Sequence, residues 1–258
     1  MAIMIRLFRV SGRGSWRGRL RVLGGVASVL LLIGILLLIV SCDGQREIAR
    51  RLGRIEDRVT FFSPTQERLV ALTIDDGPVS GSSEKILDVL RERDARATFF
   101  LIGGRIGGHE SIVKRMVEEG HELGNHTWDA RASIQVPIEE LEQGMRRTHR
   151  LLETYGPIRC FRPGSGFYND AILERAASFG YRTVLGDVFP YDTTIQDSSF
   201  HVRFILDQVR PGSIIVLHDA AGRGERTAVT LKRVVPVLQE QGYRLVTLTE
   251  LLGTRQKK

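Results

Sequence analysis

Apolar and polar positions alternate along the chain in blocks that predict strands and helices in turn. Short apolar runs bounded by glycine, proline or acidic residues are typical of buried strands. They lie at Leu69–Ile74, Ala97–Ile102, Glu122–Asn125, Tyr181–Leu185, Ser213–Leu217 and Tyr243–Val246. Apolar residues at helical spacing lie between these runs and predict helices. Those helices cover Ser82–Arg93, Glu110–Glu119, Pro137–Tyr155, Asp170–Phe179, Ser199–Val209 and Thr227–Gln241.

This alternation predicts an α/β fold in which a parallel sheet is built from successive βα units. About seven such units fit a closed or partly closed (β/α) barrel better than a flat sheet. The carboxyl ends of the strands in a barrel converge on one face, where active sites lie. The side chains that follow each predicted strand are therefore candidates for such a site.

Acids, imidazoles and an arginine follow four of the strand candidates and the short segment Cys160-Phe161, which precedes a turn. They are Asp75-Asp76, His126, Arg162, Asp187 and His218. Each has a structural alternative, since Asp75-Asp76-Gly77-Pro78 resembles a turn and a single histidine often has a structural role. Packing does not explain all five positions together. The pattern predicts a functional site at this face of the sheet.

The N-terminal region has a different pattern. The stretch from Val22 to Cys42 contains no charged residue and is long enough for a membrane-spanning helix, which needs about 20 apolar residues. Arginines precede it, and the positive-inside bias places that end in the cytoplasm. The sequence predicts a basic leader over 1–21, a transmembrane helix or lipoprotein signal over 22–42, a stalk over 43–66 and a domain over 67–258. Cys42 is the lipidation site in the lipoprotein alternative. Both alternatives tether the domain to a membrane, facing the periplasm or cell exterior.

The composition of the 258-residue chain narrows the classes of partner. The formal net charge is +7 and 42% of the residues are hydrophobic, an ordinary globular balance. The excess charge is local to the leader, which carries Arg6, Arg9, Arg13, Arg17, Arg19 and Arg21. A near-neutral remainder argues against a nucleic-acid partner. Two cysteines, far apart in the sequence, exclude a disulfide scaffold. No pattern indicates an oligomeric state.

Four segments at the predicted strand ends resemble the signatures of the metal-dependent polysaccharide deacetylases. Thr73-Ile74-Asp75-Asp76-Gly77-Pro78 resembles the first motif of that family, TFDDGP. Asn125-His126-Thr127, Arg162–Gly166 and Leu217-His218 then follow in the family's order. The resemblance runs from about Leu69 to Leu252 and implies a distorted, incomplete (β/α) barrel.

The resemblance also implies roles for these residues. Asp76 and His126 would hold a divalent metal ion, with zinc the first expectation and cobalt or manganese as alternatives. The ion would polarise the acetyl carbonyl and acidify a water. Asp75 would be the general base and Arg162 would orient it. His218 would be the general acid, with Asp187 as its partner.

The remaining implied residues would contact the substrate. Backbone N–H groups near Ser165 and Gly166 would help to stabilise the tetrahedral oxyanion. Leu217 would line the pocket for the acetyl methyl group. Phe189 or Tyr191 would provide an aromatic wall for a sugar ring, because the segment 186–192 lacks the tryptophan usual in the family.

The chain departs from the family pattern at a metal ligand. The usual second motif has a second histidine where this chain has Ala130, which cannot bind a metal. Three outcomes are open: Asp129 replaces that ligand, water completes a weaker site, or the metal is lost together with the activity. The arginine turn reads RPGSG where RPPxG is commoner, which indicates a more open loop.

The predicted function is metal-dependent hydrolysis of N-acetyl groups on an N-acetylglucosamine-containing polysaccharide, such as peptidoglycan, a chitin-like polymer or an exopolysaccharide. One alternative is a catalytically impaired glycan-binding homologue that lost its third metal ligand. Another is an esterase or amidase that acts on a non-carbohydrate acyl group.

Overall fold

The computed structural model describes residue 47, residue 51, residues 56–220 and residues 222–253. The predicted leader, the predicted transmembrane or signal segment and part of the predicted stalk lie outside these residues. Within the described ranges, no helix is both long and apolar enough to cross a membrane.

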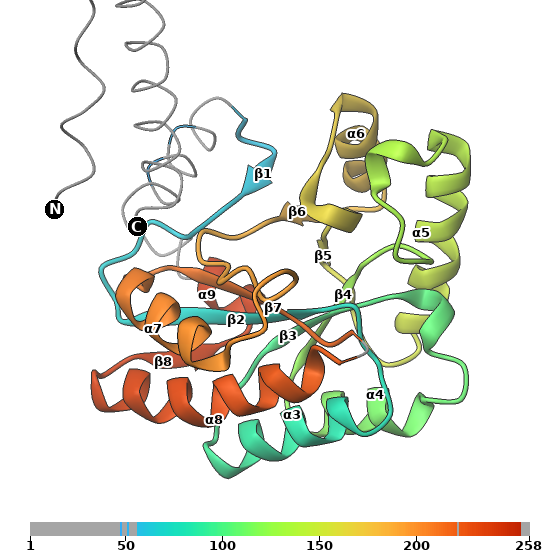
Figure 1. Cartoon of the computed structure of the whole chain (residues 1–258). Helices are drawn as coiled ribbons and strands as arrows, with labels where there is room; N and C mark the ends of the chain where they lie inside the picture. The colour runs from blue at the N-terminus through green and yellow to red at the C-terminus, as the bar shows by residue number, and fades with distance from the viewer. Residues whose placement is uncertain (1–46, 48–50, 52–55, 221, 254–258) are drawn as a thin grey trace, which may run out of the picture.

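The described domain is an α/β structure around an eight-stranded sheet (Figure 1). The strand order is β1-β6-β5-β4-β3-β2-β7, with β8 paired to β2. Every paired strand is parallel to its neighbour, which confirms the predicted α/β class and parallel sheet. The strands are β1 Val59–Thr60, β2 Leu69–Asp75, β3 Thr98–Leu101, β4 Glu122–Asn125, β5 Cys160–Phe161, β6 Arg182–Val184, β7 Ile214–His218 and β8 Arg244–Val246.

The sheet curves until the segment after β6 meets β7. Val188 forms an isolated parallel bridge with Ile215, and the Val216 N–H donates to the Val188 carbonyl at 2.8 Å. Because β7 also pairs with β2, this bridge joins the two sides of the curved sheet. The carboxyl ends of β2, β4, β5 and β7 therefore face a common region.

Helices cover the outside of the sheet (Figure 1). Helices α3 and α8 pack side by side, and α7 packs against α8. The helices are α3 Ser82–Glu92, α4 Glu110–Glu118, α5 Ile138–Leu152, α6 Asp170–Ser178, α7 Ser198–Gln208, α8 Gly224–Glu240 and α9 Leu248–Gly253. Three 3₁₀ turns lie between them: η1 Gly103–Arg105, η2 Ser133–Gln135 and η3 Gly164–Gly166.

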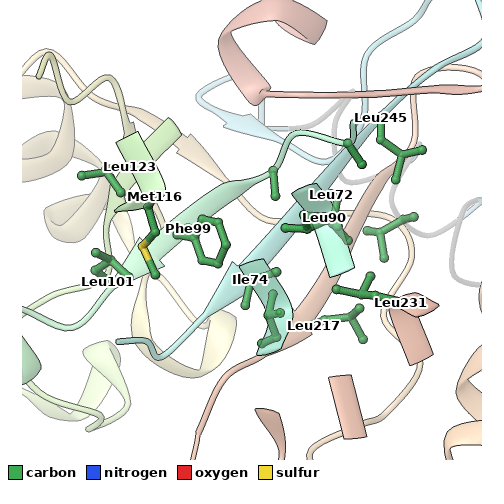
Figure 2. Packing of buried hydrophobic residues seen from close by; sticks show 14 of the residues in the cluster. Leu72, Ile74, Leu90, Phe99, Leu101, Met116, Leu123, Leu217, Leu231 and Leu245 are labelled. Atoms are coloured by element: carbon green, nitrogen blue, oxygen red, sulfur yellow. The ribbon is translucent and has the colours of Figure 1, made fainter. Parts of the chain in front are cut away.

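Strand β2 is buried along its whole length because both of its faces contact apolar side chains. Successive side chains of a strand point to opposite faces. Leu72 and Ile74 pack with the large cluster that includes Phe99 and Leu231 (Figure 2). Ala71 packs on the other face in a cluster with Phe100, Cys160, Val184 and Val246. Such an unbroken apolar run is typical of a strand covered on both sides.

The predicted boundary between stalk and domain is wrong. Val59–Thr60 forms β1 and pairs with β6, and Phe61 and Ser63 are buried. The polar composition of 43–66 concealed these apolar residues. The domain therefore includes at least residues 59–63, which the sequence assigned to the stalk.

Gly212 joins this early segment to the sheet. The Ser63 N–H donates to the Gly212 carbonyl at 2.8 Å, and the Gly212 N–H donates to the Leu69 carbonyl at 2.8 Å. Gly212 has a φ of +82°, and a Cβ atom there would lie 1.8 Å from the Ser63 carbonyl oxygen. The chain thus has no room for a side chain at this position.

We expect Gly212→Ala to lower the free energy of unfolding by about 3 kcal/mol, through backbone strain and the displaced Ser63 segment. Urea unfolding followed by circular dichroism measures this. Gly107→Ala is the matched control, because a Cβ at Gly107 meets nothing within 4 Å. Equal stability of the two variants would contradict the prediction.

Candidate active site at the strand ends

The acidic pair lies where β2 ends. Asp75 is the last residue of β2 and is buried. Its carbonyl accepts from the Asp219 N–H at 2.7 Å, while the Asp76 N–H donates to the Phe100 carbonyl at 3.1 Å. Asp76 has a φ of +76°, unusual for a residue with a side chain. These bonds hold the two carboxylates in fixed directions above the sheet.

Arg162 fixes the carboxylate of Asp75. Its Nη1 lies 2.5 Å from Asp75 Oδ1, and both side chains are almost fully buried. The same guanidinium donates to the Thr73 hydroxyl and to the carbonyls of Val184 and Leu185. Burial lowers the pKa of Arg162, and the charge of Asp75 opposes that effect. A buried ion pair with this many hydrogen bonds is rigid, so Asp75 presents one oxygen in one direction.

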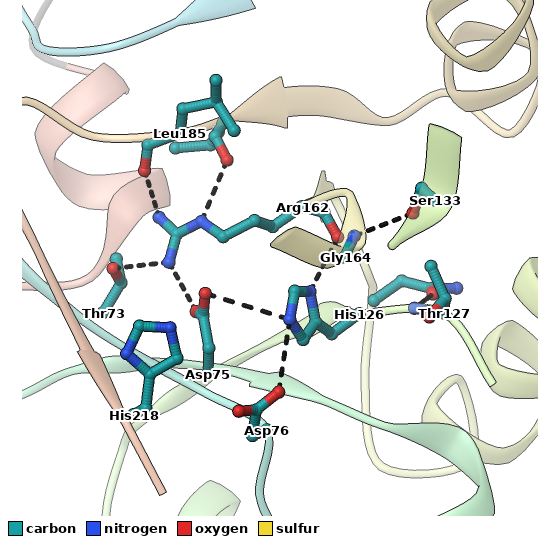
Figure 3. A network of polar contacts seen from close by, with 12 residues as sticks. Thr73, Asp75, Asp76, His126, Thr127, Ser133, Arg162, Gly164, Leu185 and His218 are labelled. Atoms are coloured by element: carbon teal, nitrogen blue, oxygen red, sulfur yellow. Dashed lines mark hydrogen bonds and ion pairs between the residues drawn. The ribbon is translucent and has the colours of Figure 1, made fainter. Parts of the chain in front are cut away.

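His126 is oriented by the backbone of the same arginine (Figure 3). Its Nδ1 lies 2.8 Å from the Arg162 carbonyl oxygen. A carbonyl only accepts, so Nδ1 carries a proton, and in the neutral tautomer the lone pair is on Nε2. This Nε2 lies 3.6 Å from Asp76 Oδ1 and 3.9 Å from Asp75 Oδ2. The imidazole therefore directs an acceptor nitrogen towards both acids.

The partner of His218 is Asp192. The His218 Nδ1 lies 3.0 Å from Asp192 Oδ1, and the His218 backbone N–H donates to Asp192 Oδ2 at 2.9 Å. Burial alone would lower the pKa of His218. The hydrogen bond and charge of Asp192, with the charges of Asp75 and Asp76, outweigh burial and raise the pKa of His218 above its ordinary value. Figure 3 shows the ring beside Asp75.

The prediction that Asp187 pairs with His218 is wrong. The Asp187 carboxylate accepts from the Ile214 N–H at 2.8 Å and from the Ser213 hydroxyl at 3.1 Å. It therefore lies at the first residue of β7, whereas His218 is the last, about 13 Å away at the usual rise of a strand. The sequence did offer Asp192 as a second candidate for the partner of His218, because the segment 186–192 contains two acids, Asp187 and Asp192.

Of the three outcomes open for the third metal ligand, the structure does not support replacement by Asp129. Both of its carboxylate oxygens accept from the Arg131 side chain, and Oδ1 also accepts from the Arg131 N–H at 3.0 Å. The side chain is 42% exposed. The neighbouring Arg131 guanidinium lowers the pKa of Asp129. This carboxylate is committed to a surface ion pair, and Ala130 is exposed beside it.

Asp76 and His126 nevertheless fit a divalent cation. Bonds of about 2.0–2.2 Å from one ion allow its oxygen and nitrogen donors to lie up to about 4 Å apart. The 3.6 Å between Asp76 Oδ1 and His126 Nε2 is within that limit. No set of three or more His, Cys, Asp or Glu residues in the described part of the chain is arranged around one metal position. The site thus offers two protein donors.

The residues predicted to contact the substrate differ in their exposure. Ser165 and Gly166 lie in the exposed turn after Arg162, both with positive φ. Phe189 is 41% exposed, and its ring contacts that of Tyr191 edge-on. Leu217 is fully buried in the large apolar cluster. The structure therefore assigns Leu217 to the core and leaves the other residues at the surface of the site.

Backbone strain is concentrated on the loops of this site. Asp76, Thr127, Ser165 and Tyr191 all have positive φ values without being glycine. The Asn125 side chain accepts from the Thr127 N–H at 2.9 Å and so supports the strained residue directly after His126. Strain of this kind persists only where surrounding contacts impose it, and it is common at functional sites.

Comparison with known proteins identifies the family of this site. The family model described as polysaccharide deacetylase matches residues 62–184. A peptidoglycan-N-acetylglucosamine deacetylase of Bacillus cereus is 36% identical over 198 residues, covering 75% of this chain and 92% of that protein. This chain belongs to the polysaccharide deacetylase family.

Two further polysaccharide deacetylases agree with this assignment. A chitooligosaccharide deacetylase of Sinorhizobium fredii is 32% identical over 194 residues, covering 70% of this chain and 90% of the relative. A solved peptidoglycan N-acetylglucosamine deacetylase has a TM-score of 0.73 and 29% identity, covering 78% of this chain and 96% of the solved one. The similarity in sequence and in fold therefore spans most of the described domain.

Proposed function

We propose that this chain hydrolyses N-acetyl groups on N-acetylglucosamine units of a polysaccharide, outside the cytoplasm. The observation that carries the proposal is the arrangement around Asp75. Its carboxylate is fixed by Arg162, with His126 on one side and the His218–Asp192 pair on the other. A base and an acid held on rigid elements at one point are the groups that amide hydrolysis needs.

Asp75 and His218 divide the proton transfers between them. Asp75 Oδ1 is held by Arg162, so Oδ2 accepts a proton from the attacking water as its oxygen bonds to the acetyl carbon. His218 Nδ1 is held by Asp192, so Nε2 donates a proton to the amide nitrogen as the C–N bond breaks. Acetate and a free amine on the sugar are the products.

We propose a divalent cation on Asp76 and His126, with zinc first and cobalt or manganese as alternatives. The ion would supply Lewis-acid polarisation of the acetyl carbonyl. The fixed Nε2 lone pair of His126 supports this assignment, because ligand histidines typically donate their other ring N–H to a backbone carbonyl or a carboxylate.

Exposed apolar side chains at the rim of the site support a glycan substrate. Ile134, Phe167 and Phe189 are 48%, 64% and 41% exposed and lie in the segments that follow β4, β5 and β6. Ile134 lies in η2 and Phe167 directly follows η3, and the two turns are joined by a bond from the Gly164 N–H to the Ser133 hydroxyl at 2.8 Å. An apolar rim of this kind suits the faces of sugar rings.

Acetate release tests the proposal. The full chain, purified in detergent, would be incubated with acetylated chito-oligosaccharide or peptidoglycan, with and without added Zn²⁺, Co²⁺ or Mn²⁺. We expect acetate release that needs one of these ions and that chelation removes. Glycan binding without acetate release would instead support the impaired homologue, which the absent third donor at Ala130 favours.

We expect Ala130→His to strengthen zinc binding by about tenfold or more, because it restores an imidazole donor at the position that the family uses. Calorimetric titration of the full chain with Zn²⁺ measures this. Ala132→His, two residues further along, is the matched control. Equal affinities for the wild type and Ala130→His would show that residue 130 does not reach the ion.

We also propose that the segment 22–42 tethers this domain to a membrane, with the domain in the periplasm or at the cell exterior. The proposal is supported by the uncharged segment and the arginine-rich leader before it. Mass spectrometry of the mature N-terminus distinguishes an intact anchor from a chain that begins at lipidated Cys42.

A further inference from the structure

Asp76 lies between two arginines that the family resemblance did not indicate. Arg105 donates to the Asp76 backbone carbonyl. Arg223 places its Nη1 3.7 Å from Asp76 Oδ2, while Asp76 Oδ1 faces His126. One oxygen of this carboxylate is therefore directed to the imidazole and the other to a guanidinium.

The position of Arg223 is fixed by the packing of the residue that follows it. Gly224 begins α8, and a Cβ atom there would lie 2.1 Å from Asp219 Oδ1 and 2.5 Å from the Ser82 hydroxyl oxygen. The absence of a side chain lets the start of α8 lie directly against Asp219. Asp219 is in turn bonded through its N–H to the Asp75 carbonyl. The contact between Arg223 and Asp76 is thus part of a close-packed junction.

The backbone on both sides of this junction is bonded as well. The Arg223 N–H donates to the Ala220 carbonyl at 2.8 Å. The Thr227 hydroxyl, one turn into α8, donates to the His218 carbonyl at 2.8 Å. These bonds attach the start of α8 to the strand end that carries the proposed general acid. The Arg223 side chain is 34% exposed, so it has room to move away from Asp76.

Each acid of the site has a cationic or titratable partner of its own. Asp75 pairs with Arg162, Asp192 pairs with His218, and Asp76 pairs with Arg223. A guanidinium near a carboxylate lowers the attraction of that carboxylate for a second cation. A divalent ion on Asp76 and His126 would therefore lie close to the charge of Arg223.

We propose that Arg223 is an internal counter-ion of Asp76, which competes with the divalent cation and sets the affinity of the site for it. With two protein donors and a competing guanidinium, the site holds its cation weakly, and Arg223 moves away from Asp76 when the ion binds. Arg223 acts on the cation through Asp76. This inference rests on the proposed cation site.

The test consists of two titrations of the full chain in detergent, without substrate. Zn²⁺ binding is measured by calorimetry, and Co²⁺ binding is measured by visible absorption. We expect Arg223→Gln to tighten binding of both ions by about tenfold. Arg223→Lys keeps the charge and should remain close to the wild-type affinity. Lys232→Ala is the matched control, because it removes one positive charge from an exposed position on the same helix.

Each outcome decides the proposal. Tighter binding by Arg223→Gln alone supports it. Equal affinities for Arg223→Gln and the wild type overturn it while leaving the proposed cation site intact. An equal gain in Lys232→Ala also overturns it, because the effect would then be one of net charge. Failure of all variants to bind either ion overturns both the counter-ion and the proposed cation site.

Discussion

Asp75→Asn is expected to lower kcat/KM for acetate release by about 10³-fold, because the amide cannot take the proton of the attacking water. Zinc affinity should change little, since Asp76 and His126 provide the donors. The variant also leaves the buried guanidinium of Arg162 without its ionic partner. We therefore expect the free energy of unfolding to fall by about 3 kcal/mol.

Acetate release, zinc titration and urea unfolding separate these effects. Asp207→Asn is the control, because Asp207 is exposed on α7 and the substitution makes the same chemical change away from the site. Wild-type turnover in Asp75→Asn would remove Asp75 as the base. Lost turnover accompanied by lost zinc binding would show that the substitution disrupts the whole site.

Asp192→Asn is expected to lower kcat by about 10²-fold or more and to move the alkaline limb of the pH–rate profile to lower pH. The hydrogen bond and charge of Asp192 help to raise the pKa of His218. The general acid must be protonated, so activity is lost as pH rises through the pKa of His218. Removing the charge of Asp192 lowers that pKa, and the loss then begins at lower pH.

Asp187→Asn is the matched control for this experiment. Its carboxylate bonds the start of β7, so we expect reduced stability and an unchanged alkaline limb. A shifted limb in Asp187→Asn, with none in Asp192→Asn, would reverse the assignment of the partner of His218.

The same raised pKa has a consequence for stability. Protonated His218 gains its partner on folding, so its contribution to the free energy of unfolding is complete below the ordinary pKa of histidine. That contribution is lost as pH rises through the higher pKa of the folded protein.

The sequence predicted the parallel sheet and the strand ends of the site because both depend on local patterns. Buried strands such as β2 have continuous apolar runs, and Asp75, His126, Arg162 and His218 stand directly at or after strands. Strand β1 was missed because it is two residues long and follows a polar stretch. A strand so short has no periodicity to detect.

The errors within the site have a common cause, which is that each depends on a contact that local sequence patterns do not show. Asp187 lies two residues after the predicted strand Tyr181–Leu185, so the sequence favoured it over Asp192. The bridge between Val188 and Ile215 places Asp187 beside the start of β7 instead. Asp129 stands next to Ala130 in the sequence, but the Arg131 side chain holds its carboxylate. The contact of Arg223 with Asp76 depends on Gly224 and its packing, which no local sequence pattern reveals.

Arg162 positions two groups of the site at once, the proposed base Asp75 and the proposed cation ligand His126. Its side chain holds Asp75 and its backbone carbonyl holds His126, and both depend on where the two-residue strand β5 ends. A displacement of that strand would misalign the base and the cation ligand at once. His218 is attached to β7 and Asp192 instead. The pKa of His218 can therefore change through Asp192 without moving Arg162, whereas a shift of β5 alters the proposed base and the proposed cation ligand together.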